Sequence, residues 1–206
     1  SIIFAIYLMP TQPLVAAEYV EQHIAPANLV NPWKAADEEY AEPSTTKKLK
    51  LGQRIAFPDF GKPGHWYVQR LTDRSYFMIC NGFASTVFVG NKGVLIIDTS
   101  NTVVPVDMFA AIKGFTDLPI KALAYTHMHT DHVGGSFRVK EALKTKGKEL
   151  RIIASASAAR EIKAHQNNAA PPTEILADGR SKFMFEDFEF VMGTPIVAAH
   201  SAADSY

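Results

Sequence analysis

The sequence predicts an α/β fold built in layers, with β-hairpins first and strands alternating with helices afterwards. Two observations carry this prediction. The continuous apolar run Val94–Ile97 suits a strand that is buried on both of its faces. From there to His165, apolar strand-like segments alternate with segments whose apolar residues recur at helical spacing.

The hairpins come first along the chain. Two short segments of apolar, β-branched and aromatic residues are predicted strands, Tyr76–Cys80 and Ser85–Val89. The pair Asn81-Gly82 between them is a turn signal, and Asn91-Lys92-Gly93 predicts a second turn before the strand Val94–Ile97.

The alternating part comes after the hairpins. Helical spacing of apolar residues predicts helices over 106–115, 136–146 and 156–165. Apolar runs between these segments predict strands over 119–125 and 152–154. After the Pro171-Pro172 break, three closing strands are expected over 183–185, 188–192 and 196–199.

Composition excludes several classes of protein. The 206 residues are 47% hydrophobic, as in an ordinary globular chain, and no apolar run approaches the roughly 18 residues that span a bilayer. Lys plus Arg and Asp plus Glu both number 21, so the basic excess of a nucleic-acid binder is missing. Because Cys80 is the only cysteine, a disulfide framework and a multi-cysteine zinc site are excluded, and histidines must carry any zinc chemistry.

The amino-terminal part is predicted to stand apart from the layered domain. Ile2–Met9 is a short apolar run, and a cleavage-like Val-x-Ala follows it at Val15–Ala17, a pattern that resembles a secretory signal. We therefore expect a signal segment over 1–17, an extension over 18–74 and the layered domain over 75–206, in a periplasmic or secreted protein. The alternative is a first strand or interface segment of a cytoplasmic protein.

The segment Tyr125–Gly135 contains four potential metal ligands within six residues. In a chain that leaves a strand with period two, His127, His129 and Asp131 share one side, and His132 points elsewhere. Such a loop can serve two adjacent metals, with His127 and His129 on one and Asp131 and His132 on the other. Zinc prefers the imidazole nitrogen and carboxylate oxygen on offer.

A loop of this composition without a metal is the competing interpretation. It would bury several desolvated imidazoles with nothing to compensate the lost hydration. We therefore predict metal binding. Gly134 and Gly135 are expected to permit a tight turn into the next helix.

The block His127-x-His129-x-Asp131-His132, followed by two glycines, resembles the signature of the metallo-β-lactamase-fold hydrolases. The resemblance covers about Ser75 to Tyr206. It implies an αββα sandwich, of which this chain is expected to supply the amino-terminal half together with the extension. It also implies two Zn²⁺ ions in a complete site, with other divalent metals as alternatives.

Two further residues are assigned through the same resemblance. Asp98, at the end of the run VLIID, matches an acidic residue that lies beneath the metal loop and orients it by hydrogen bonds. His200 resembles the ligand of the family's next motif, although Ala203 replaces a glycine of that motif. The resemblance places His127, His129 and His200 on the first metal, and Asp131 and His132 on the second.

The function that the resemblance implies is zinc-dependent hydrolysis by a metal-bound hydroxide, with Asp131 as the catalytic residue that orients it. The substrate is expected to be a small molecule: an ester, lactone, lactam or sulfate ester. Segment 146–154 shows a faint resemblance to alkylsulfatases, and the His after Asp131 occurs in class B β-lactamases.

A non-catalytic metal-binding fragment is the alternative. The family supplies a bridging Asp and a further His from a second half, and the sequence stops six residues after His200. We therefore expect either a missing carboxy-terminal half or an oligomer that covers the open face.

Overall fold

The computed structural model describes residues 40–50, 53–55, 65–80, 82–100, 105–165, 169–195, 200–201 and 203–206. The residues from Ala41 to Tyr206 form one compact unit, which contains the whole of the largest sheet. The expected signal segment, most of the extension and the expected strand 196–199 lie outside the described residues.

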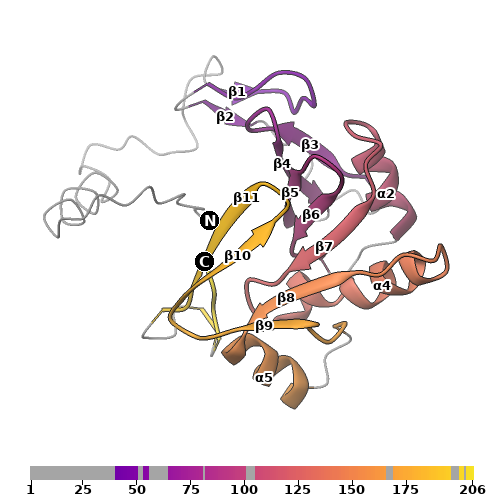
Figure 1. Ribbon diagram of the computed structural model, residues 1–206. Coiled ribbons are helices and arrows are strands. Elements are labelled where there is room, and N and C mark those ends of the chain that lie inside the picture. Colours follow the sequence, from indigo (N-terminus) through magenta and orange to yellow (C-terminus); the bar gives the residue numbers. More distant parts are fainter. Residues whose placement is uncertain are drawn as a thin grey trace, which may run out of the picture. The chain divides into compact units, whose positions relative to one another are not determined.

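A seven-stranded sheet forms the centre of the unit (Figure 1). In spatial order its strands are β3 (Tyr67–Arg70), β4 (Ser75–Cys80), β5 (Phe83–Val89), β6 (Val94–Ile97), β7 (Ile120–Ala124), β8 (Arg151–Ser155) and β9 (Glu174–Leu176). Strands β3 to β6 pair antiparallel, whereas β6 to β9 pair parallel. The carboxyl ends of β6, β7 and β8 therefore meet at one edge of the sheet.

Three helices cover one face of the sheet: α2 (Pro105–Lys113), α4 (Ser136–Lys144) and α5 (Ala156–His165) (Figure 1). Each helix turns a pair of apolar residues four apart toward the sheet, which are Met108 and Ile112, Val139 and Leu143, and Ala158 and Ile162. This spacing places each pair on one side of its helix, and all six side chains join a single core cluster.

The hairpin of β10 (Arg180–Phe185) and β11 (Phe188–Gly193) covers the opposite face. Its Phe183, Phe185 and Met192 pack in one cluster with Leu95 of β6. Because Val94 and Ile96 face the helices while Leu95 faces the hairpin, and all three are fully buried, the prediction of a strand buried on both faces is confirmed.

The layered α/β fold is confirmed, and the helices and strands predicted within the described residues all occur, with ends that shift by a few residues. Several elements were not predicted: β3, β9, the short helix α3 (Thr130–Val133), and the two-stranded sheet of β1 (Tyr40–Ala41) and β2 (Arg54–Ile55). β3 and β9 are the edge strands of the large sheet, and their short stretches carry no long apolar run.

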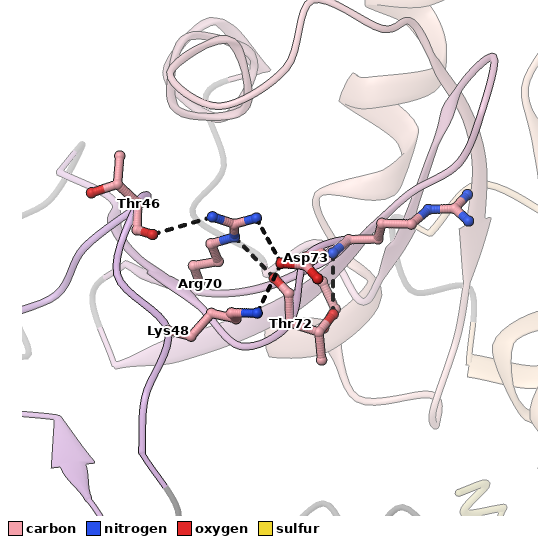
Figure 2. Close-up of polar contacts among 7 residues, drawn as sticks. Thr46, Lys48, Arg70, Thr72 and Asp73 are labelled. Atoms are coloured by element: carbon pink, nitrogen blue, oxygen red, sulfur yellow. Dashed lines mark hydrogen bonds and ion pairs between the residues drawn. The ribbon is translucent and has the colours of Figure 1, made fainter.

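The segment before the sheet lies along β3 and is held there by polar contacts (Figure 2). Arg70 donates to the carbonyl oxygen of Thr46 (3.2 Å), and Asp73 pairs with Lys48 (2.9 Å) and Arg70 (3.0 Å). These ion pairs are exposed and contribute little. The buried Gln69 side chain contributes more, since it accepts from the Ser44 N–H and donates to the Lys47 carbonyl.

Candidate metal centre

The predicted metal ligands gather where the parallel strands end. Asp98 follows β6, and the segment from Thr126 to His132 follows β7. The loop that carries His200 is tied to the same edge, because the Ser205 N–H donates to the Thr126 carbonyl (2.6 Å) and the Ser205 hydroxyl donates to Ser155 at the end of β8 (2.9 Å). Ligand sites in open α/β sheets occur at this edge.

Three imidazoles meet there, those of His127, His129 and His200, which we call site 1. Nδ1 of His129 lies 3.1 Å from Nε2 of His200, and one ligand atom from each residue lies within 4.8 Å of the others. Two nitrogens bound to one tetrahedral zinc at about 2.05 Å lie about 3.3 Å apart. The spacing of these side chains thus suits a common metal ion.

The third nitrogen of site 1 supplies an independent test of this fit. Nε2 of His127 is buried and has no hydrogen-bond partner in the described part of the chain. A buried polar atom without a partner costs about 1–3 kcal/mol. A metal ion bound by Nε2 would satisfy it, so the donor set of site 1 fits a divalent metal.

Asp131 and His132, which we call site 2, lie in the first turn of α3 rather than in an extended chain. His129 has extended backbone (φ −64°, ψ 140°) and precedes the helix, so the expected alternation stops there. As a result His132 does not point away from Asp131. Its Nε2 lies 3.6 Å from Oδ2 of Asp131, a separation that two ligands of one metal can adopt.

Asp98 holds His132 from the other side. Oδ2 of Asp98 lies 2.9 Å from Nδ1 of His132, which leaves Nε2 directed toward Asp131. A carboxylate on the far nitrogen fixes the tautomer and orientation of a metal-binding imidazole. Although Asp98, His127 and His132 also lie close enough to hold a metal as a group, the Asp98 carboxylate already accepts three hydrogen bonds from the loop. Its geometry therefore favours the orienting role.

The residues after Asp98 hold α3 through the backbone. The Thr99 N–H donates to the carbonyl of His132 (2.7 Å), and the Gly135 N–H donates to the carbonyl of Ser100 (2.6 Å). Asp98 and Ser100 are buried with positive φ (57° and 60°), a conformation that costs non-glycine residues about 1–3 kcal/mol each.

As expected, a tight turn at Gly134 and Gly135 leads into α4, but it does not use the positive φ that glycine permits. Gly134 and Gly135 have ordinary right-handed helical backbone (φ −63° and −76°). The left-handed conformations occur instead in the segment that contacts this turn, at Asp98 and Ser100.

The His200 loop is organised by Asp204, a residue to which the sequence pattern assigns no metal-binding role. Its carboxylate accepts from the backbone N–H of His200 (2.6 Å), and from the N–H and hydroxyl of Ser201 (2.9 Å and 2.6 Å). An Asp that caps nearby backbone N–H groups is a local pattern that could have been noticed in the sequence.

Replacing Asp204 with alanine is expected to weaken zinc binding at site 1 about 10- to 100-fold, because the loop loses the acceptor that fixes the His200 backbone. Zinc affinity measured against a chromophoric chelator checks this. The exposed carboxylate of Asp117 supplies the control variant Asp117→Ala, which should bind zinc like the wild type. Equal affinity of Asp204→Ala and wild type would contradict the prediction.

The pKa values of the buried His127 and the partly buried His132 are shifted in opposite directions. Burial lowers the pKa of His127 to about 4, and the neighbouring His132 adds to this effect. Burial also lowers the pKa of His132, but the hydrogen bond from its ring to Asp98 and the charges of Asp98 and Asp131 outweigh burial, so that its pKa is raised. Neutral His127 is thus available to a metal well below neutral pH.

These pKa shifts predict how the stability of the metal-free protein depends on pH. Above pH 6.5 the lowered pKa of His127 contributes about 3 kcal/mol to the free energy of unfolding. This contribution is lost as the pH falls toward 4. The contribution of His132 to the free energy of unfolding depends on pH in the opposite sense. It is present below pH 6.5 and is lost as the pH rises through the raised pKa of His132. Urea unfolding in a chelator between pH 7 and 4 should show a smaller loss of stability in His127→Gln than in wild type; parallel curves would refute this.

Comparison with known proteins identifies the class to which this fold and site belong. The family model of the metallo-β-lactamase superfamily matches residues 81–200. The chain belongs to this superfamily. Its layered α/β architecture is therefore that of a metallo-β-lactamase fold, as the sequence resemblance implied.

Solved structures agree on the fold. BJP-1, a subclass B3 metallo-β-lactamase of Bradyrhizobium japonicum, is 20% identical with a TM-score of 0.53, over 67% of this chain and 54% of that one. FEZ-1 of Legionella gormanii is also 20% identical, with a TM-score of 0.51 over 66% of this chain and 55% of that one. This chain therefore aligns with about half the length of either lactamase.

A curated relative of higher identity is a linear primary-alkylsulfatase of a Pseudomonas species. It is 36% identical over 64 residues, which are 31% of this chain and 12% of the alkylsulfatase.

In the described part of the chain, no helix has the length and apolar character required to cross a bilayer.

Proposed function

We propose that the chain carries the zinc-binding residues of a metal-dependent hydrolase, and that its substrates are sulfate esters of linear alcohols. Superfamily membership supports the hydrolase class. The local identity to a linear primary-alkylsulfatase favours sulfate esters over the ester, lactone and lactam alternatives. The observation that carries the proposal is the meeting of the three imidazoles of site 1, one of which, His127, has a buried Nε2 without a hydrogen-bond partner among the described residues.

Each residue of the loop has a role in this proposal. His127, His129 and His200 hold one divalent ion, and Asp131 with His132 supplies ligands to a second. A divalent metal held by these residues would polarise the scissile ester and lower the pKa of a water molecule. The Asp131 side chain is 39% exposed, so its carboxylate can accept a hydrogen bond from an incoming water molecule and orient it toward the substrate.

A hydrolysis panel on the zinc-loaded full-length protein tests the proposal. The substrates are decyl sulfate, a p-nitrophenyl ester, a simple lactone and a chromogenic cephalosporin, with sulfate release followed by ion chromatography. We expect sulfate release from decyl sulfate and much slower turnover of the other three. Faster turnover of the cephalosporin would refute the substrate assignment. Stoichiometric zinc without any hydrolysis would refute the enzyme and favour a non-catalytic metal-binding role.

A further inference from the structure

The Thr126 side chain lies between Asp98 and the first histidine of the metal loop. Its hydroxyl donates to Oδ2 of Asp98 at 2.6 Å, and the same oxygen lies 2.9 Å from Nδ1 of His127. A threonine hydroxyl has a single hydrogen to donate. Since that hydrogen is directed to Asp98, the hydroxyl can only accept from His127, and Nδ1 of His127 must carry the imidazole hydrogen.

This assignment determines the state of the other ring nitrogen. A neutral imidazole with its hydrogen on Nδ1 has a lone pair on Nε2. Nε2 of His127 is a buried atom without a hydrogen-bond partner among the described residues, and His127 belongs to the group of three histidines that could hold a metal. The contact with Thr126 thus leaves a metal-binding lone pair on the atom that has no other partner.

Oδ2 of Asp98, the oxygen that accepts from Thr126, also orients a histidine of site 2. Oδ2 of Asp98 lies 2.9 Å from Nδ1 of His132, so His132 also carries its hydrogen on Nδ1 and directs Nε2 toward Asp131. The backbone N–H of Thr126 donates to Oδ1 of Asp98 (2.9 Å), which holds the carboxylate in place. Among the hydrogen bonds of the described residues, Asp98 therefore reaches His132 directly and His127 through the Thr126 hydroxyl.

We propose that Thr126 is a positioning residue whose hydroxyl transmits the orienting effect of the Asp98 carboxylate to His127. A single carboxylate thereby fixes the metal-binding tautomer of one histidine in each site. This inference rests on the metal centre of the proposed function and adds a residue to it. Sites 1 and 2 then share one orienting group and differ in how they depend on Thr126.

Two substitutions at Thr126 separate the hydroxyl from the shape of the side chain. Thr126→Val keeps the shape and removes the hydroxyl, whereas Thr126→Ser keeps the hydroxyl. We expect Thr126→Val to weaken zinc binding at site 1 about 10- to 100-fold, the range for lost orienting partners, and site 2 much less. Thr126→Ser should restore wild-type affinity, and Asp98→Asn should weaken both sites. Affinities for the two zinc equivalents come from chelator competition.

The tautomer itself can be measured without metal. In ¹⁵N-histidine-labelled, metal-free protein at pH 8, long-range ¹H–¹⁵N spectra should show His127 with its hydrogen on Nδ1 in wild type and Thr126→Ser, and a shift toward Nε2 in Thr126→Val. A purely structural role of Thr126 would not move these imidazole shifts.

The outcomes distinguish this inference from the proposed function. Hydrogen on Nε2 of His127 in wild type would overturn the relay, even if Thr126→Val did not fold. Two zinc ions bound by Thr126→Val with wild-type affinity would also overturn it while leaving the metal centre intact. A wild-type protein that binds no zinc would instead refute the metal centre, and the tautomer spectra would still decide whether the relay exists.

Discussion

Replacing both His127 and His129 with alanine should abolish tight zinc uptake. The change removes two of the three imidazoles of site 1, including the buried Nε2 that has no hydrogen-bond partner among the described residues. Four ligands of a structural zinc together supply about 10–16 kcal/mol, so losing two should weaken binding by at least about 1,000-fold. Elemental analysis after gel filtration measures the bound zinc.

The matched control for this experiment is the double variant His65→Ala with His165→Ala. Both histidines are exposed and lie outside the two candidate sites, so zinc content should equal that of the wild type. If the variant without His127 and His129 retained its full zinc stoichiometry, the assignment of site 1 would be wrong.

Replacing Asp131 with asparagine should lower turnover far more than it lowers occupancy of site 1. The amide keeps the size of the side chain but loses the negative charge that a second metal and an incoming water molecule would use. Loss of an acceptor that positions a reacting proton costs about 100- to 10,000-fold in kcat. Site 1 should keep its metal, because none of its three imidazoles is altered.

Zinc content and kcat measured on the same preparations test this division of roles. Asp117→Asn serves as the control, since its side chain is exposed and outside the candidate sites. If Asp131→Asn lost both metals equally and kcat fell only in proportion to the zinc content, the two sites would not have the separate roles described.

Much of the fold could be predicted because burial leaves a pattern in consecutive residues. The run Val94–Ile97 indicated a strand covered on both sides, and the four-residue spacing of Val139 and Leu143 indicated a helix with one buried face. The edge strands β3 and β9 were not predicted. Each is short and pairs with a neighbouring strand on one side, so its sequence contains few apolar residues that would indicate a strand.

The sequence by itself determined the candidate ligands that are neighbours in the chain, His127 to His132, because their number and spacing are visible without any fold. Asp98 and His200 were assigned to the site through the family resemblance, and only the tertiary structure decided which atoms of these distant groups meet the loop. It brings His200 to His129, 71 positions away, and aims Asp98 at His132, 34 positions away. It also places the Thr126 hydroxyl on the Asp98 carboxylate and the Thr99 backbone N–H on the His132 carbonyl. Such contacts depend on where parallel strands end and on single hydrogen-bond directions, and neither leaves a periodic trace in the sequence.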